Sequence, residues 1–184
     1  MAVDTPIDQY RVFGNPIHQS KSPNIHTAFA TATGQHINYQ AQLVAEGAFE
    51  TTVTDFFESG GKGLNITVPF KQRAFAMAQV LSPAAQKAEA ANTLYVNPQG
   101  QLVADNTDGM GLVRDICHNL GGELKAQRIL VLGAGGAVRG VLQPILAQRP
   151  AQVIIANRTH SKALDLAASF TDLGPIEAVP MAQL

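Results

Sequence analysis

The side chains best suited to chemistry lie close together in the segment 61–71, whose sequence is Gly-Lys-Gly-Leu-Asn-Ile-Thr-Val-Pro-Phe-Lys. Residues 63–68 are predicted to form a short buried strand, followed by a helix with Pro69 in its first turn, where a missing N–H costs little. Asn65 and Thr67 are two residues apart and therefore point to the same face of the strand. Lys71 falls in the first turn of the helix, where the helix dipole disfavours a cation by roughly 0.3–1 kcal/mol. We interpret this convergence as a binding site; the alternative is helix capping beside an ordinary solvated lysine.

A second stretch suited to ligand binding is a glycine-rich turn between a predicted strand and a predicted helix. Residues 128–132 form a continuous apolar run, the pattern of a parallel strand covered on both faces. The turn that follows consists of Gly133, Ala134, Gly135, Gly136 and Ala137. Backbone N–H groups in such a turn can approach a pyrophosphate, and the helix N-terminus adds its dipole. This context favours a dinucleotide site, although Val138 stands where the usual fingerprint has Gly or Ala; a tight turn without a ligand is the alternative.

The strand after this turn indicates which dinucleotide would bind. An enzyme that selects NAD usually has Asp or Glu about 20 residues past the glycines, bonded to the ribose 2′-hydroxyl. This chain instead has Asn157, Arg158 and Thr159, with Lys162 shortly after. An arginine in place of the carboxylate suits the 2′-phosphate of NADP through charge-assisted hydrogen bonds. The sequence therefore predicts NADP as the cofactor, unless Arg158 is a solvated loop residue.

Two serines and an aspartate lie at predicted helix starts. Ser20 and Ser22 bracket Lys21 just before a helix N-terminus, where a small carboxylate binds readily. Ser22 is also expected to cap that helix, ahead of Pro23. Asp108 opens another helix and is either a cap or a site residue. The five histidines have no carboxylate or cysteine at ligand spacing, so no metal site is expected.

Composition excludes several classes of function. With 46% hydrophobic and 15% charged residues, the chain is globular rather than disordered. Its net charge of -1 argues against a nucleic-acid or anionic-membrane binder. The single cysteine, Cys117, excludes an internal disulfide framework and fits a reducing compartment. No apolar run reaches the roughly 20 residues of a membrane helix, and the N-terminus lacks a signal-peptide pattern, so we expect a soluble cytoplasmic protein.

Strands and helices alternate along the chain, which predicts the α/β class. Strands are expected at 10–14, 37–43 and 92–96, with 101–104 pairing back on 92–96 as a hairpin, and three more follow from 128 onwards. The inward face of the helix that begins near Ser22 is expected to carry Ile25, Phe29 and Ala32. The inward face of a helix over about 46–58 is expected to carry Phe49, Val53 and Phe56.

Six motifs, in this order, carry a resemblance to a known family. They are Gly14-Asn15-Pro16-Ile17, Ser20-Lys21-Ser22-Pro23, Asn65-Ile66-Thr67-Val68-Pro69-Phe70-Lys71, Ala91-Asn92-Thr93, Asp105-Asn106-Thr107-Asp108-Gly109 and Gly133-Ala134-Gly135-Gly136-Ala137. Together they resemble the shikimate dehydrogenases, NADP-dependent enzymes that reduce 3-dehydroshikimate in aromatic amino-acid (chorismate) biosynthesis. The resemblance extends over essentially the whole chain.

The resemblance implies roles for individual residues. The substrate carboxylate would be held by Ser20 and Ser22, and the ring hydroxyls by Asn65, Thr67, Asn92 and Asp108. The catalytic pair would be Lys71 and Asp108, while residues 157–162 would clamp the adenosine phosphate. Lys162 stands where this family often has arginine. Lysine keeps the charge but lacks the forked guanidinium group. The implied reaction is the reversible NADPH-dependent reduction of 3-dehydroshikimate to shikimate, and a quinate/shikimate dehydrogenase with NAD tolerance is the nearest alternative.

Length is the main departure from the family, whose members run well past 184 residues and complete the cofactor sheet. We therefore expect a truncated chain, with a substrate domain built on a mixed sheet at 1–106. The first part of a doubly wound (Rossmann-type) NADP-binding domain is expected at 107–184. There are two alternatives. The chain could be a non-catalytic fragment that binds substrate, or a fragment that does not fold stably because its sheet has an open edge. The protein is expected to be a monomer or homodimer.

Overall fold

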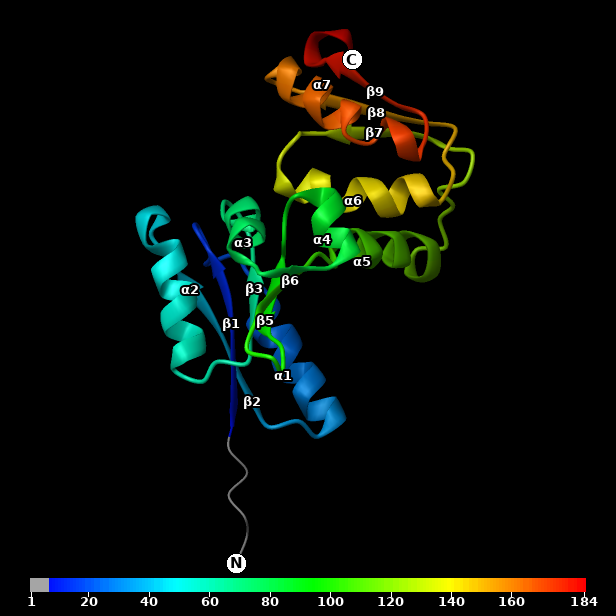
Figure 1. Ribbon diagram of the computed structural model, residues 1–184. Coiled ribbons are helices and arrows are strands. Elements are labelled where there is room, and N and C mark those ends of the chain that lie inside the picture. Colours follow the sequence, from blue (N-terminus) through cyan, green and yellow to red (C-terminus); the bar gives the residue numbers. More distant parts are fainter. Residues whose placement is uncertain (1–6) are drawn as a thin grey trace, which may run out of the picture. The chain divides into compact units, whose positions relative to one another are not determined.

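The computed structural model describes residues 7–184 and divides the chain into two compact units (Figure 1). The first unit contains the residues up to Ser82 together with Ala91–Asp105, and the second contains Pro83–Ala90 and Asn106–Leu184. The first six residues, which belong to the N-terminal stretch tested above for a signal peptide, lie outside the described part. The sequence had suggested one boundary after residue 106 and gave no sign that Pro83–Ala90 packs with the later residues.

A six-stranded mixed sheet forms the centre of the first unit. Its strands are β1 (Asp8–Gly14), β2 (Ile37–Leu43), β3 (Gly63–Ile66), β4 (Val80–Leu81), β5 (Thr93–Val96) and β6 (Leu102–Asp105), in the order β2-β1-β3-β5-β6-β4. The strand β5 runs antiparallel to both β3 and β6, and the other pairs are parallel. The predicted hairpin is therefore confirmed as β5–β6, whereas the two-residue strand β4 was not predicted.

Helices cover both faces of this sheet. They are α1 (Ser22–Thr33), α2 (Phe49–Glu58), which follows a 3₁₀ turn (Glu46–Ala48), and α3 (Lys71–Met77). Figure 1 shows α1 on one side of the sheet and α2 with α3 on the other. On the α2 side the ring of Phe13 packs edge-on against Phe56, with centroids 6.0 Å apart. The predicted inward face of α2 is confirmed, since Phe49, Val53 and Phe56 are all buried.

The inward face predicted for α1 is wrong. Ile25 and Phe29 are 46% and 61% exposed, although Phe29 contributes to a groove on this side of the sheet. Ala30 is buried, and the imidazole of His26 stacks on the ring of Tyr39 with centroids 4.1 Å apart. The buried and stacked residues of α1 are therefore not those that the apolar spacing predicts.

The second unit is built on a three-stranded parallel sheet, β7-β8-β9. Its elements are α4 (Pro83–Ala88), α5 (Asp108–Arg114) with a π-helical turn (Asp115–Asn119), β7 (Arg128–Leu132), α6 (Gly136–Ala147), β8 (Gln152–Asn157), α7 (His160–Ala168), β9 (Ile176–Pro180) and 3₁₀ turns at Thr171–Leu173 and Met181–Gln183. The ion pairs Lys87–Asp172 and Glu89–Arg139 join the α4 segment to the rest of this unit. Exposed pairs of this kind each contribute little stability.

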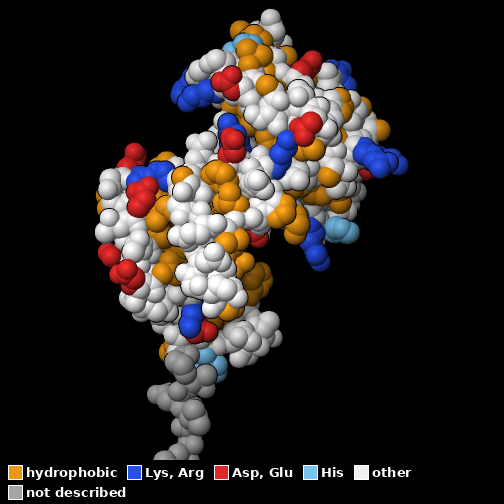
Figure 2. Space-filling model, viewed as in Figure 1, with side chains coloured by type: hydrophobic (Ala, Val, Ile, Leu, Met, Phe, Trp, Pro, Cys, Tyr) orange, Lys and Arg blue, Asp and Glu red, His pale blue; other side chains and the backbone are white. Residues whose placement is uncertain are grey.

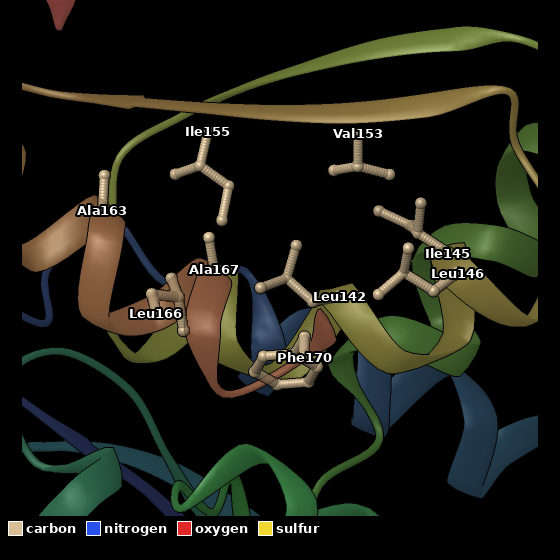
Figure 3. Close-up of a cluster of buried hydrophobic side chains, with 9 residues drawn as sticks. All are labelled: Leu142, Ile145, Leu146, Val153, Ile155, Ala163, Leu166, Ala167 and Phe170. Carbon is tan, nitrogen blue, oxygen red and sulfur yellow. The ribbon is translucent and has the colours of Figure 1, made fainter. Parts of the chain in front are cut away.

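Both crossover helices of the second unit pack on the same face of the sheet. Figure 3 shows Leu142, Ile145 and Leu146 of α6 gathered with side chains of β8 and α7 beneath the strands. On β7, however, Leu130 and Leu132 are 50% and 62% exposed. The expectation that this apolar strand is covered on both faces is therefore wrong for the described residues, in which α6 and α7 supply cover on one side.

Figure 2 shows Lys and Arg side chains and Asp and Glu side chains spread over this face of the molecule, several of them next to a side chain of opposite charge. This view agrees with the near-neutral net charge of -1.

Close backbone contact joins α5 to α6 in the second unit. A Cβ added to Gly109 would lie 2.5 Å from the carbonyl oxygen of Gly140, and one added to Gly140 would lie 2.7 Å from Oδ1 of Asn106. Both distances are far below ordinary van der Waals contact, so the two glycines allow the helices to approach. Asn106 is 4% exposed and donates from Nδ2 to the carbonyl oxygen of Ala90 at 2.8 Å. Because Asn106 is buried and hydrogen bonded, it cannot easily move aside for a side chain at Gly140.

Replacing Gly140 with Ala is expected to destabilise the second unit by about 1–3 kcal/mol, the usual cost of overpacking a tight contact. Gly111→Ala is the matched control, because a Cβ there meets nothing within 4 Å in the same pair of helices. It should stabilise the protein by up to about 1 kcal/mol through helix propensity. Urea unfolding of both variants provides the measurement, and equal midpoints would show that the close approach is not needed.

Candidate functional site

The carboxyl ends of three parallel strands of the first unit, β1, β3 and β6, face the same edge of its sheet. The segments that leave β1 and β3 are joined by backbone hydrogen bonds from Asn15 N to Val68 O and from Thr67 N to Phe13 O, each 2.9 Å. Strand β3 ends at Ile66, one turn follows, and Lys71 is the first residue of α3. The prediction that Pro69 lies within the helix is wrong, since it occupies the preceding turn after a cis peptide bond.

Asn92 lies between β3 and β6 at this edge. Its N–H donates to Asp105 O at 3.0 Å, and its carbonyl oxygen accepts from Ile66 N at 2.8 Å. The neighbouring Ala91 N donates to the carbonyl oxygen of Lys71 at 2.8 Å. Main-chain hydrogen bonds thus bring the segments of Asn65 and Lys71 together with that of Asn92, although the sequence separates them from it by about twenty residues or more.

Ser20 and Ser22 lie at the start of α1, but their local roles differ from those expected. Ser22 is the first helical residue, and the capping position belongs to Lys21. The Ser22 N–H donates to Oγ of Ser20 at 3.3 Å, so Ser20 is the residue whose side chain meets a backbone N–H there. The prediction of Ser22 as the cap is therefore wrong by one position.

Two residues not anticipated from the sequence, Tyr39 and Thr93, link the predicted ones. Tyr39 Oη donates to Asn65 Oδ1 at 2.6 Å. Asn65 Nδ2 donates over 3.4 Å to Thr93 Oγ1, which in turn donates to Asn92 Oδ1 at 2.8 Å. Burial raises the pKa of Tyr39 to about 12, against the opposing effect of a hydrogen bond with Ser22. The phenol therefore stays protonated and keeps its donor at neutral pH.

A groove of about 500 Å³ runs along the α1 side of this sheet. Aromatic rings of Tyr10, His26, Tyr39 and Tyr95 contribute to its lining. Among the described residues that line it, Asn65 is the one also predicted from the sequence as a site residue. The groove is thus lined in part by the hydrogen-bonded residues Tyr39, Asn65 and Thr93, and it extends beyond them.

In the second unit, Asp108 is the first residue of α5, after Thr107 at the capping position. Its N–H donates to Oδ1 of Asn106 at 3.2 Å. Because Asn106 is itself held by Ala90, the backbone at Asp108 is fixed through a buried side chain. Asp108 follows closely on Asp105, the last residue of β6.

The glycine-rich turn has the backbone of a phosphate-binding loop. Gly133, with φ of +116°, adopts a conformation that side chains rarely allow, and its N–H donates to Ala156 O at 2.8 Å. Gly135 caps α6, and a Cβ added there would meet nothing within 4 Å. Open space therefore lies in front of the N-terminus of a twelve-residue helix, which suits an anion.

The connection between β8 and α7 carries cationic side chains. Asn157 ends β8, and its Nδ2 donates to the carbonyl oxygen of Thr159 at 2.8 Å, which tightens the connection to α7. Arg158 and Lys162 are exposed. Two exposed cations, a glycine turn and an open helix N-terminus together fit the phosphates of a dinucleotide.

The described residues, 7–184, lack two other kinds of feature. In that range, no group of three or more His, Cys, Asp or Glu side chains is arranged to hold a metal ion. Over the same residues, the helices are too short or too polar for one of them to span a bilayer.

The architecture defined so far is that of a two-part α/β protein, with polar loops at the edge of a mixed sheet and a nucleotide-type turn in a parallel sheet. Two family models match it. Residues 12–94 match the shikimate dehydrogenase substrate binding domain, and residues 115–184 match shikimate / quinate 5-dehydrogenase. The chain belongs to the shikimate dehydrogenase family, which confirms the resemblance drawn from the six motifs.

Individual relatives agree with this assignment. The chain is 56% identical to the shikimate dehydrogenase (NADP(+)) of Cellvibrio japonicus over 177 residues, which are 96% of this chain and 64% of the relative. Shikimate dehydrogenase from Aquifex aeolicus is 30% identical with a TM-score of 0.86, over 96% of this chain and 64% of that one. Shikimate 5-dehydrogenase from Thermus thermophilus, solved with NADP(H) and shikimate, is 31% identical with a TM-score of 0.83. That match covers 95% of this chain and 63% of the other. These structures confirm the predicted fold class, and the chain spans less than two thirds of the relatives' length.

The stack of His26 on Tyr39 predicts a pH dependence of stability. Burial lowers the pKa of His26 below its ordinary value of 6.5, so the folded state binds this proton less readily than the unfolded state. Its contribution to stability is therefore present above about pH 6.5 and is lost as the pH falls through the lowered pKa. The melting temperature should drop between about pH 7.5 and 5.5 by less in His26→Phe, which keeps a stacked ring without a charge, than in the parent protein. His36→Gln, at an exposed position, should leave the drop unchanged. Identical pH profiles for His26→Phe and the parent would contradict this account.

Proposed function

We propose that this chain, in its complete reading frame, catalyses the reversible NADPH-dependent reduction of 3-dehydroshikimate to shikimate. The observation that carries the proposal is the convergence of the Asn65, Lys71 and Asn92 segments at one sheet edge in a member of this family. Polar side chains held by main-chain hydrogen bonds suit a small hydroxylated acid, because buried polar partners reject analogues that lack the matching hydroxyl.

Substrate recognition is divided among the loops at this edge. Ser20 and Ser22 hold the carboxylate near the N-terminus of α1, where N–H groups favour an anion. The ring hydroxyls are bound by Asn65, Thr67, Asn92 and Asp108. Support comes from the short hydrogen-bonded path that connects Asn65 with Asn92 through Thr93.

Catalysis requires a proton for the oxygen that becomes an alkoxide as hydride reaches the carbonyl carbon. Lys71 donates that proton as the general acid. Asp108 stabilises the ammonium group and is a partner for it during the return of a proton from solvent. When bound, the dinucleotide supplies the hydride.

The proposed cofactor-binding residues are the turn Gly133, Ala134, Gly135, Gly136 and Ala137 and the cationic segment Asn157, Arg158, Thr159 and Lys162. The turn and the α6 N-terminus would hold the pyrophosphate. Arg158 favours NADP, since its guanidinium binds a phosphate through paired hydrogen bonds. Lys162 adds charge without the paired geometry.

Two alternatives are separated by direct measurements. A quinate/shikimate dehydrogenase with NAD tolerance would turn over quinate and show little preference for NADP. A non-catalytic module would bind shikimate in a calorimeter without turnover. We also propose a cytoplasmic monomer or homodimer, and the single cysteine, which suits a reducing compartment, supports that location.

In the complete reading frame, Lys71→Ala should lower kcat for shikimate oxidation by about 10²–10⁴-fold, the range expected when a general acid–base group is lost. Lys62→Ala is the control, because it removes an exposed lysine from the same segment. A fall of less than about tenfold for Lys71→Ala would assign the proton transfer to another group.

Arg158→Gln should raise KM for NADP by about tenfold or more and leave KM for NAD nearly unchanged, because one charge-assisted contact to the 2′-phosphate is lost. Lys125→Gln removes an exposed cation elsewhere in the second unit and should change neither value. If the ratio of NADP to NAD efficiency stays the same in Arg158→Gln, the cofactor preference resides elsewhere.

A further inference from the structure

A directional chain of hydrogen bonds runs through the first unit. Tyr39 Oη donates to Asn65 Oδ1 at 2.6 Å, Asn65 Nδ2 donates to Thr93 Oγ1 at 3.4 Å, and Thr93 donates to Asn92 Oδ1 at 2.8 Å. On its other side, the ring of Tyr39 stacks on His26 of α1, the helix that begins at Ser22. Two residues proposed to bind substrate, Asn65 and Asn92, are therefore connected through Thr93, and Tyr39 holds the first of them.

The phenol fixes the orientation of the Asn65 amide. A carboxamide has one acceptor and one two-proton donor, and its two ends differ only in their hydrogen-bond partners. Here the short bond from Tyr39 occupies Oδ1, so Nδ2 must take the opposite side. The bonds that Nδ2 makes to Thr93 Oγ1 and Asn92 O are both 3.4 Å, beyond the usual N–H···O range. A substrate hydroxyl oxygen would therefore be a better partner for Nδ2 than those it has.

The ring of Tyr39 is itself held rigidly. It is 7% exposed, packs in a cluster with Val12 and Ile17, and carries the stacked imidazole of His26 at 4.1 Å. His26 is one helical turn after Ser22 in α1, so the same contact ties the start of α1 to β2. Since the phenol keeps its proton, with a pKa raised to about 12, it is a constant donor and is unsuited to exchange protons in turnover.

We propose that Tyr39 is a positioning residue of the substrate site: its hydroxyl orients the Asn65 amide, and its ring, stacked on His26, holds the start of α1 beside β2. In consequence the groups that recognise the carboxylate and a ring hydroxyl stay at a fixed spacing. This inference rests on the proposed function, because it assigns Tyr39 to that same site. The effect of removing the hydroxyl should appear in substrate affinity and selectivity and not in the chemical step.

The test is Tyr39→Phe in the complete reading frame, which removes the hydroxyl and keeps the stacked ring. KM for shikimate should rise about tenfold with kcat within about threefold, the pattern of a lost interaction made equally in ground and transition states. KM for NADP should not change. The ratio of kcat/KM for shikimate over a deoxy analogue lacking one ring hydroxyl should shrink, because a freely rotating amide no longer demands the missing group. Tyr95→Phe, which removes an exposed phenol from the same groove, is the control and should match the parent.

Several outcomes would overturn the proposal. An unchanged KM for shikimate and unchanged selectivity in folded Tyr39→Phe would do so. A lower kcat, a higher KM for both shikimate and NADP and a lower melting temperature would together show a structural role instead. If Tyr39→Phe does not fold, Thr93→Val decides, since it breaks the next link and should raise KM for shikimate severalfold; no change would refute the chain of contacts.

The same samples separate this inference from the proposed function. A parent protein with no turnover of shikimate would refute the proposed function. Calorimetry would then compare shikimate binding: about tenfold weaker binding by Tyr39→Phe supports the positioning role, while equal or absent binding refutes it.

Discussion

The backbone of Asn92 is the contact on which the rest of the candidate site depends. Its N–H is bonded to Asp105 and its carbonyl oxygen to Ile66, so a single residue fixes the β5–β6 hairpin against β3. Because β5 runs antiparallel to its neighbours, its first residue lies at the edge where β1, β3 and β6 end. Four segments therefore deliver polar side chains to one edge, and open α/β sheets bind ligands at the carboxyl ends of their strands. The antiparallel strand is what brings an asparagine into a site otherwise made of strand-following loops.

Features encoded over a few residues could be predicted from the sequence. The hairpin, the glycine-rich turn and the inward face of α2 each depend on a local period or on turn residues, and the structure has all three. Two local rules failed where a distant contact competed. Proline before a helix suggested a first-turn position, but Pro69 lies in the turn that joins β3 to α3. In α1 the apolar spacing favoured Ile25 and Phe29, yet both are exposed, while His26 stacks on Tyr39 of β2.

The residues that the sequence did not reveal are those whose roles exist only after strands pair. Tyr39 looks like an ordinary alternating position of a half-buried strand, and Thr93 like a common strand residue. Their polar atoms matter because β2, β3 and β5 place them beside Asn65. One signal was available: tyrosine at an inward strand position needs a partner for its hydroxyl, which points to a polar neighbour at the same depth. The position of Pro83–Ala90 within the second unit had no such signal, since it rests on ion pairs and on Asn106.

In the second unit, a few contacts link the backbone of Asp108 to the helix that follows the glycine-rich turn. Asn106 accepts the N–H of Asp108 through Oδ1 and lies where a side chain on Gly140 would be. Gly140 is one turn into the helix that begins at the glycine-rich turn, so the backbone of Asp108 and the α6 N-terminus share one close-packed contact. A packed interior transmits displacement instead of absorbing it. Any shift of the turn on binding an anion would therefore be felt at Asp108, while Lys71 belongs to the other unit.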